Sequence, residues 1–98
     1  MSGWRVEIPP HVAGAMRHLP PEVKRGVKAA LRAIVADPFI GEPLRRDLEG
    51  LWKYRVRRYR LVYTADRADR LVRIFAVGHR RGIYEEVADR VRRRGRGR

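Results

Sequence analysis

Basic residues recur at alternate positions in the segment 51–63. Lys53 and Arg55 are two residues apart, and Arg60 follows the pair Arg57–Arg58. Side chains two residues apart point to the same face of a β-strand, so Lys53 and Arg55 are expected to share a face. A turn near Arg57–Arg58 would return the chain and place Arg60 beside them. Like charges on neighbouring strands repel, so the cluster indicates a groove for an anionic ligand. The alternative is a solvated basic face on an ordinary hairpin.

The apolar and aromatic positions of the same segment have the opposite phase. The side chains predicted to be buried on the other face are Trp52, Tyr54, Leu61 and Tyr63. This alternation predicts a β-hairpin with one basic face and one face against the core.

A second basic cluster follows the apolar segment 71–77. Gly78 is expected to end that strand and to release His79, Arg80 and Arg81 into a loop, with Tyr84 at the start of a helix. An aromatic ring beside a basic groove can stack on a splayed nucleotide base. The alternative is that Tyr84 only covers the core.

The net charge indicates a polyanionic partner. The chain has 24 Lys and Arg against 11 Asp and Glu, a formal net charge of +13. Arginine dominates, and its planar fork fits phosphate oxygens two at a time, so nucleic acid is the simplest partner. Solubility alone needs a far smaller imbalance. The chain has no cysteine, which excludes disulfides, Cys-based zinc sites and thiol catalysis. No apolar run is long enough for a membrane span, and the N-terminus has no secretory pattern, so the cytoplasm is expected.

The elements that must position these residues follow from periodicity. Residues 4–8 alternate as a first strand, and a helical pair is predicted over 11–19 and 22–36. The two hairpin strands, the strand 71–77 and a last helix over 83–94 complete the order β-α-α-β-β-β-α. This order predicts one α+β domain over residues 1–94, with a helical hairpin packed on a small antiparallel sheet. Residues 95–98 are expected to be a basic tail without structure.

The motifs WKYRVxxYRLVY (52–63) and VGHRRxxY (77–84) together resemble the RelE/ParE superfamily of type II toxin–antitoxin toxins. The resemblance covers nearly the whole chain and is closer to RelE-like toxins, which are ribosome-dependent mRNA endonucleases, than to ParE-like toxins, which inhibit DNA gyrase. It implies catalytic roles for Lys53, Arg55, Arg60, Arg80 and Tyr84.

The resemblance also implies a second set of candidates. The related YoeB-type toxins use a glutamate before a Pro-Leu pair, and GEPL places Glu42 there. His79 and Arg81 are candidates because relatives use histidine and because loop lengths vary. Arg57 and Arg58 are expected to contact RNA. Close relatives often have Gly-Asp at this hairpin turn, so the Arg57–Arg58 turn is expected to be wider or strained.

The implied reaction needs no metal or cofactor, because the RNA 2′-OH can serve as the nucleophile. Lys53, with Arg55, is expected to carry the proton, since neighbouring cations disfavour its charged form. Arg60 would hold the phosphate, Arg80 would lie near the leaving group and Tyr84 would stack on a base. An ordered ribosomal A site would align the substrate, an effect worth about 7–11 kcal/mol.

Two other functions remain open from the sequence. One is gyrase inhibition without catalysis, and the other is a non-enzymatic nucleic-acid-binding module. The toxin reading implies an acidic antitoxin as partner, beside the ribosome and mRNA, and no membrane.

Overall fold

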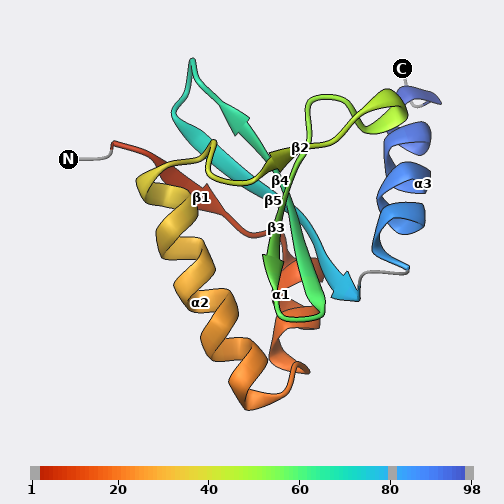
Figure 1. Cartoon of the computed structure of the whole chain (residues 1–98). Helices are drawn as coiled ribbons and strands as arrows, with labels where there is room; N and C mark the ends of the chain where they lie inside the picture. Colours follow the sequence, from red (N-terminus) through yellow and green to blue (C-terminus); the bar gives the residue numbers. More distant parts are fainter. Residues whose placement is uncertain (1–2, 80–81, 97–98) are drawn as a thin grey trace.

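The computed structural model describes residues 3–79 and 82–96 as a sheet between a helical hairpin and a C-terminal helix (Figure 1). The elements in chain order are β1 (Arg5–Glu7), α1 (Pro10–Arg17), α2 (Pro21–Ala36), β2 (Glu42–Pro43), the 3-10 turn η1 (Arg46–Leu48), β3 (Trp52–Val56), β4 (Tyr59–Asp66), β5 (Leu71–His79) and α3 (Ile83–Arg96). The α+β architecture and the order of the predicted elements are confirmed, and the short strand β2 is an addition.

The five strands lie in the order β1-β5-β4-β3-β2. β3, β4 and β5 pair antiparallel, as predicted, and the additional strand β2 pairs antiparallel with β3. β1 instead runs parallel to β5, with Val6 opposite Val72. The expectation of an antiparallel sheet is therefore wrong at this edge. Alternation in the sequence shows which face a strand buries, but it does not show which strand lies beside it.

The helical hairpin forms where proline fixes the first turn of each helix. Pro10 and Pro21 occupy the first helical positions, where the missing backbone N–H costs no hydrogen bond. In α2 the residues four or three apart form one buried stripe that contains Val23, Val27, Ala30 and Ile34. This stripe is the predicted one, and it lies against the sheet because burying apolar surface stabilises the helix more than its intrinsic propensity does.

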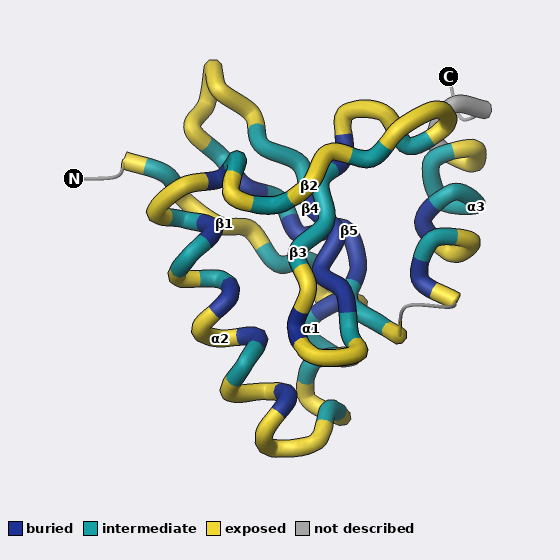
Figure 2. The backbone as a smooth tube through the Cα atoms, viewed as in Figure 1, coloured by how far each residue is buried: buried dark blue, intermediate teal, exposed yellow. Residues whose placement is uncertain are grey.

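Each face of the sheet has its own apolar core (Figure 2). On the side of α1 and α2, which we call the hairpin face, the buried residues are Val12, Val23, Val27, Ala30, Ile34, Val56, Leu61, Tyr63, Val72 and Ile74. On the other side, which we call the α3 face, they are Leu51, Val62, Phe75, Ala76, Ile83 and Val87. β5 is therefore covered on both sides, as its continuous apolar sequence predicted.

The boundaries of two elements differ from those predicted. β5 continues past Gly78 to His79, because Gly78 and His79 still pair with Arg60 and Tyr59 of β4. α3 continues to Arg96 rather than ending at 94. Neither extension is marked by apolar residues, so periodicity did not detect them. Among the helices of the described residues, none combines the length and apolar character that crossing a bilayer requires.

Candidate functional site

The strand register places the three predicted hairpin cations on the α3 face. Lys53 is paired with Val62, which belongs to the core under α3, and Arg55 is paired directly with Arg60. Directly paired residues point to the same side of a sheet. The intervening Tyr54 points to the hairpin face and packs against its core. The predicted separation of a basic face from an aromatic face is thus present.

Lys53 lies between a carboxylate and an aromatic ring. Its Nζ is 3.7 Å from Glu42 Oε1 and 5.9 Å from the centroid of the Tyr84 ring. The Lys53 side chain is one-third exposed, at 33%, so its ammonium group is accessible from solvent. Three residues from β2, β3 and α3 therefore meet at one point, and each of them was a sequence candidate.

The segment 37–43 brings Glu42 to this point and is anchored in the hairpin-face core. The hydroxyl of the buried Tyr63 donates a 2.7 Å hydrogen bond to the carbonyl of Pro38. Gly41 packs against the Lys53 carbonyl so closely that a Cβ there would overlap it and would lie 2.7 Å from Tyr63 Oη. Burial of the hydroxyl raises the pKa of Tyr63 from 10.0 to about 12, so the phenol stays protonated and keeps donating.

Arg60 is held by the backbone of its own hairpin. Among the described residues, Arg60 is the one charged residue that is buried, with 8% of its surface exposed. Its Nη1 donates to the carbonyl of Tyr59 at 3.1 Å and, more weakly, to that of Arg57 at 3.5 Å. A guanidinium has five N–H donors, so the remaining ones can still bind a phosphate. The turn therefore orients Arg60 without using all of its donors.

The turn that supplies these carbonyls is tight and strained. Only Arg57–Arg58 separate β3 from β4, and Arg57 has φ of +57°. Two-residue hairpin loops need a positive φ at the first loop position, where glycine, asparagine or aspartate is favoured. An arginine there costs about 1–2 kcal/mol. Of the two predicted alternatives, a wider turn or a strained one, the strained turn is present. Both side chains are exposed.

Tyr84 is carried by the first turn of α3, which is seated on the sheet. Ile83 and Val87 are almost fully buried against Val62 and Ala76. Gly78 allows this seat, because Ile83 Cδ1 lies only 3.1 Å from where a Cβ of residue 78 would be. Tyr84 itself is partly buried, so it both covers the core and faces Lys53. The two interpretations of Tyr84 are compatible.

The expected loop residues do not all lie at this point. His79 is the last residue of β5, and its partner in β4 is Tyr59, so both rings point to the hairpin face. Their ring centroids are 4.6 Å apart. The structure therefore places His79 away from Lys53, contrary to the expectation that it belongs to a loop beside the groove. The candidates Arg80 and Arg81 lie outside the described residues.

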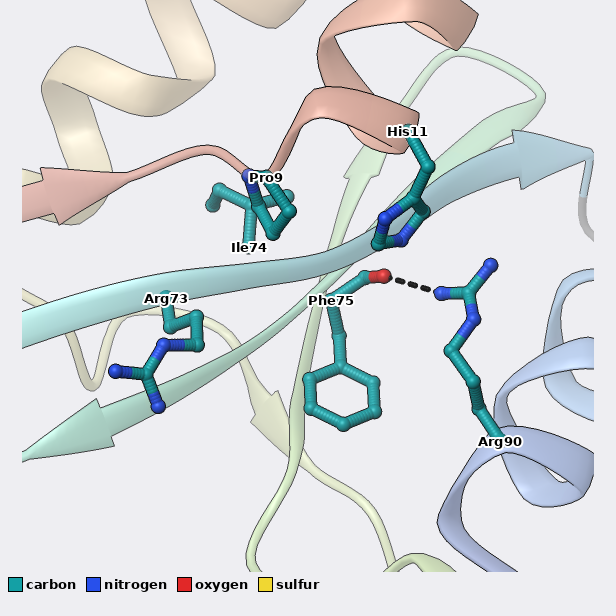
Figure 3. Close-up of a pocket in the computed structure, with 6 residues that line it drawn as sticks. All are labelled: Pro9, His11, Arg73, Ile74, Phe75 and Arg90. Atoms are coloured by element: carbon teal, nitrogen blue, oxygen red, sulfur yellow. Dashed lines mark hydrogen bonds between the residues drawn. The ribbon is translucent and has the colours of Figure 1, made fainter. Parts of the chain in front are cut away.

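A second group of basic residues lies on the other side of α3. Figure 3 shows a small pocket between the start of α1, β5 and α3, lined by Pro9, His11, Arg73, Ile74, Phe75 and Arg90. Its volume of about 20 Å³ suffices for one water molecule and excludes a nucleotide. Arg73 is also paired with Glu7 at 2.6 Å. This pocket is therefore structural.

The assembled site can bind and polarise a phosphate but has few groups for proton transfer. Lys53, Arg55 and Arg60 supply positive charge on one face, Glu42 supplies one carboxylate, and Tyr84 supplies a stacking surface. Within residues 3–79 and 82–96, no three His, Cys, Asp or Glu side chains are grouped closely enough to hold a metal ion.

The sequence did not reveal the tertiary contacts of Gly41 and Arg90, two residues on the segments that carry Glu42 and Tyr84. Gly41 permits the close approach of segment 37–43 to β3, and Arg90 joins α3 to β5 by a hydrogen bond of 2.6 Å to the carbonyl of Phe75. The signal for Gly41 was its place beside Glu42 in GEPL. For Arg90 it was the four-residue spacing from Glu86, which marks a helical ion pair.

Comparisons with known proteins agree with this architecture. A chain of the toxin–antitoxin complex RelBE2 from Mycobacterium tuberculosis is 32% identical, with a TM-score of 0.70 over 79% of this chain and 98% of that one. The isolated RelE toxin of Escherichia coli is 25% identical, with a TM-score of 0.70 over 90% and 98% of the two chains. The YoeB/ParE toxin from Agrobacterium tumefaciens, at 17% identity and a TM-score of 0.68 over 76% and 96%, shares the fold.

The sequence also matches a family directly. Residues 6–88 match the sequence model described as the ParE-like toxin of type II bacterial toxin–antitoxin systems. The search of the curated proteins found no match. The matched region runs from the second residue of β1 to Ala88 in α3, and it includes Glu42, Lys53, Arg60 and Tyr84. The chain therefore belongs to the ParE-like toxin family of type II bacterial toxin–antitoxin systems.

Proposed function

We propose that the protein is a ribosome-dependent mRNA endoribonuclease that inhibits translation in the cytoplasm. The observation that carries the proposal is the position of Lys53 Nζ, between the Glu42 carboxylate and the Tyr84 ring. The cations Arg55 and Arg60 on the same face support it, because a site without metal must supply this charge from side chains to cut RNA.

In the proposed reaction the RNA 2′-oxygen attacks the adjacent phosphorus. The 2′-OH gives up its proton, a 2′,3′-cyclic phosphate forms, and the bond to the 5′-oxygen of the next nucleotide breaks. Arg60 binds the non-bridging oxygens, on which negative charge develops. A group near the broken bond gives the leaving oxygen a proton, and Arg80 is the sequence candidate for that position. Tyr84 stacks on a base and aligns the 2′-oxygen.

The proton acceptor is the least obvious part of the proposed reaction. Lys53, with Arg55, was expected to carry the proton, but the Glu42 carboxylate lies 3.7 Å from the Lys53 Nζ and is a more conventional proton acceptor. We therefore propose that Glu42 and Lys53 act together in activating the 2′-OH. The Glu42 carboxylate takes up the 2′-OH proton, and the Lys53 ammonium stabilises the oxyanion that this leaves.

The direct test is primer extension on mRNA incubated with the purified protein, with and without ribosomes. We expect cuts only when ribosomes are present, and a loss of about 100-fold or more for Arg60→Ala and Lys53→Met. Glu42→Gln should lower the rate, because it removes the proposed proton acceptor. Wild-type cleavage rates in both Arg60→Ala and Arg80→Ala would overturn the residue assignment, and an absence of cuts would overturn the function.

Inhibition of DNA gyrase is the second candidate, and the match to a ParE-like family favours it. A supercoiling assay with purified gyrase distinguishes the two candidates. RNA binding without any cut product would instead identify a non-catalytic module. Under each of these functions we propose a cognate acidic antitoxin as partner, since structural neighbours include toxin–antitoxin complexes. Coexpression with the product of an adjacent gene should restore growth and give a stable complex.

A further inference from the structure

Helix α3 is attached to the sheet by two kinds of contact. The first is apolar: Ile83, Val87 and Val91 form a stripe against a core that includes Leu51 and Phe75. Apolar contacts stabilise the helix in proportion to buried area but have little directional preference. Burial of Ile83 and Val87 selects the face of α3 that lies on the sheet, but contacts without directional preference leave small rotations about the helix axis less strongly restrained.

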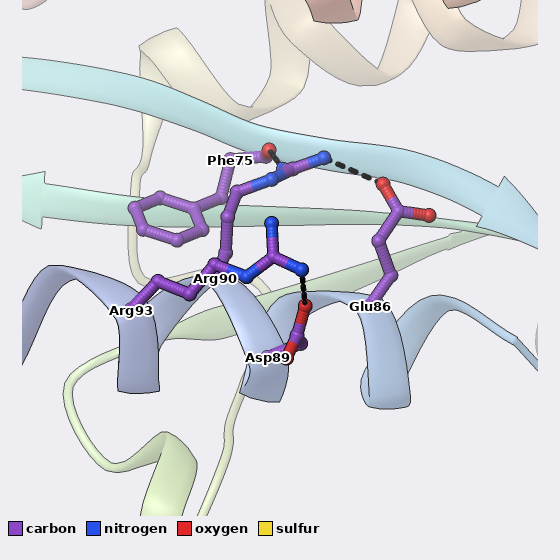
Figure 4. A network of polar contacts seen from close by, with 5 residues as sticks. All are labelled: Phe75, Glu86, Asp89, Arg90 and Arg93. Carbon is purple, nitrogen blue, oxygen red and sulfur yellow. Dashed lines mark hydrogen bonds and ion pairs between the residues drawn. The ribbon is translucent and has the colours of Figure 1, made fainter.

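The second contact is polar and directional. Arg90 Nη1 donates a 2.6 Å hydrogen bond to the Phe75 carbonyl, and Nη2 donates at 2.6 Å to Glu86 Oε2, one turn earlier on α3 (Figure 4). Glu86 thereby fixes the plane of the guanidinium from inside the helix. The Arg90–Phe75 hydrogen bond joins a side chain of α3 directly to the backbone of β5.

The acceptor lies at an irregularity of β5. Val62 pairs with Ala76 and Tyr63 pairs with Ile74, so Phe75 is an extra residue between two consecutive pairs. A bulge of this kind changes the local direction of the strand and its side chains. The Phe75 carbonyl therefore has an orientation that the neighbouring carbonyls of β5 do not share. A hydrogen bond to it favours one position and one rotation of α3 relative to the sheet.

The register of α3 decides where Tyr84 lies. Tyr84 is six residues before Arg90, about 9 Å along the helix axis. A slip of one residue would rotate the helix surface by about 100° and move the ring away from Lys53. The observed contact, with Lys53 Nζ 5.9 Å from the ring centroid, needs a fixed rotation.

We propose that Arg90 is a positioning residue, which holds Tyr84 against Lys53 through its hydrogen bond to the Phe75 carbonyl. Arg90 lines the small pocket together with Arg73 and Pro9 (Figure 3), and it is six residues along α3 from Tyr84. It therefore acts through Tyr84 and does not touch the substrate. The effect on cleavage rests on the proposed function, whereas the effect on the Tyr84 position does not.

The test uses the full chain and two measurements. The first is the ring-current shift that Tyr84 imposes on the Lys53 side-chain protons, calibrated with Tyr84→Leu. The second is the rate of ribosome-dependent mRNA cleavage. The variants are Arg90→Met, which removes the donor, Arg90→Lys, which keeps a single donor, and Glu86→Gln, which weakens the support of the guanidinium.

Asp89→Asn is the matched control. Like Glu86, Asp89 is a carboxylate on α3 that pairs with an arginine four residues later, at 3.0 Å from Arg93 Nη2. Figure 4 shows that this pair runs along the helix and does not reach the Phe75 carbonyl. The control thus removes the same charge and a similar ion pair without affecting the proposed contact.

We expect Arg90→Met to move the Lys53 shift at least halfway to its value in Tyr84→Leu, and to lower cleavage about tenfold. Arg90→Lys and Glu86→Gln should lie between Arg90→Met and wild type, and Asp89→Asn should match wild type. In the Tyr84→Leu background, Arg90→Met should cost less than about twofold, because the two residues act as one unit.

A wild-type Lys53 shift in Arg90→Met would overturn the proposal, as would an equal tenfold loss in the Tyr84→Leu background. If Arg90→Met does not fold, the comparison of Glu86→Gln with Asp89→Asn tests the proposal. Equal Lys53 shifts in these two variants would then overturn it. If wild-type protein cuts no RNA, the proposed function is wrong, and the Lys53 shift alone tests the position of Tyr84.

Discussion

The two faces of the sheet are built differently. Among the described residues, the hairpin face has a core of ten buried residues, all apolar except for the hydroxyl of Tyr63, and two helices cover it. The α3 face has a core of six buried apolar residues and one helix, which is also attached through a hydrogen bond. Yet the α3 face holds Lys53, whose contacts with Glu42 and Tyr84 define the candidate site.

The hairpin face therefore contributes most of the stability of the fold, whereas the α3 face determines the positions of the site residues. Removing a group from the hairpin face should lower the free energy of unfolding and leave the Glu42–Lys53–Tyr84 geometry intact. A change on the α3 face should alter that geometry at a smaller cost in stability. Four substitutions test this division, in order of decreasing expected effect on stability.

Ile34→Ala should have the largest effect. Ile34 is fully buried in α2 under the hairpin face, so truncation leaves a cavity and should cost about 2–5 kcal/mol. Urea denaturation measures the loss. Ile40→Ala is the control, because Ile40 is 49% exposed and its truncation should change stability by less than about 0.5 kcal/mol. A displaced Lys53 shift in folded Ile34→Ala would contradict the division between the faces.

Gly41→Ala should disturb both faces at once. The added Cβ would overlap the Lys53 carbonyl and approach Tyr63 Oη, so segment 37–43 must move, at a cost of about 1–3 kcal/mol. The Lys53 shift should change as Glu42 moves. Gly14→Ala is the control, since a Cβ there meets only the end of Arg17, at 3.9 Å, and should slightly stabilise α1. Unchanged stability in Gly41→Ala would mean that the segment is not held as described.

Tyr63 links the faces through its hydroxyl and should make stability fall at high pH. Its pKa is raised from 10.0 to about 12 in the fold, so the folded state keeps the proton more tightly than the unfolded chain. Stability is therefore full below pH 10 and declines as pH rises from 10 to 12, by about 1.4 kcal/mol at pH 11.

The measurement is urea denaturation of wild type and Tyr63→Phe at pH 9 and pH 11. Tyr63→Phe should be less stable at pH 9 by about 1 kcal/mol, because it lacks the hydrogen bond to Pro38. It should also lose less stability than wild type between the two pH values. Parallel losses in both proteins would show that another group titrates.

Arg57→Gly should have the smallest effect and the opposite sign. Glycine accepts the φ of +57° without strain, so the variant should be more stable by about 1 kcal/mol. Arg58→Gly in the same turn is the control, because it removes the same charge. It should lower stability, since glycine raises the conformational entropy of the unfolded chain and relieves no strain at this position. If both variants lose stability equally, the strain in the turn is not significant.

Much of the fold was predictable because single residues constrain it strongly. Pro21 and the stripe from Val23 to Ile34 fixed α2, and the opposite phases of Lys53 and Tyr54 fixed the two faces of β3. The parallel pairing of β1 with β5 was not predictable, because a strand's own sequence does not identify its neighbour.

Site residues could be predicted where the type of the side chain itself indicated a chemical role. Lys53, Tyr84 and Glu42 were candidates, and the structure brings them together. His79 was misplaced, because β5 continues for two residues beyond the predicted strand 71–77, so His79 pairs with Tyr59 on the hairpin face and does not enter a loop. The roles of Gly41 and Arg90 depend on tertiary contacts with Lys53 and Phe75, which local sequence patterns do not encode.

The pairing of β1 with β5 has a consequence for synthesis of the protein. Glu7 and Arg73 are bonded across 66 positions of the chain, so β1 cannot pair until β5, the last strand of the sheet, has been made. Long loops of this kind slow folding, because their closure entropy is lost before the contacts form. α3, which brings Tyr84, is translated later still. A nascent chain on its own ribosome therefore lacks the assembled site until α3 has been synthesised and has left the ribosome.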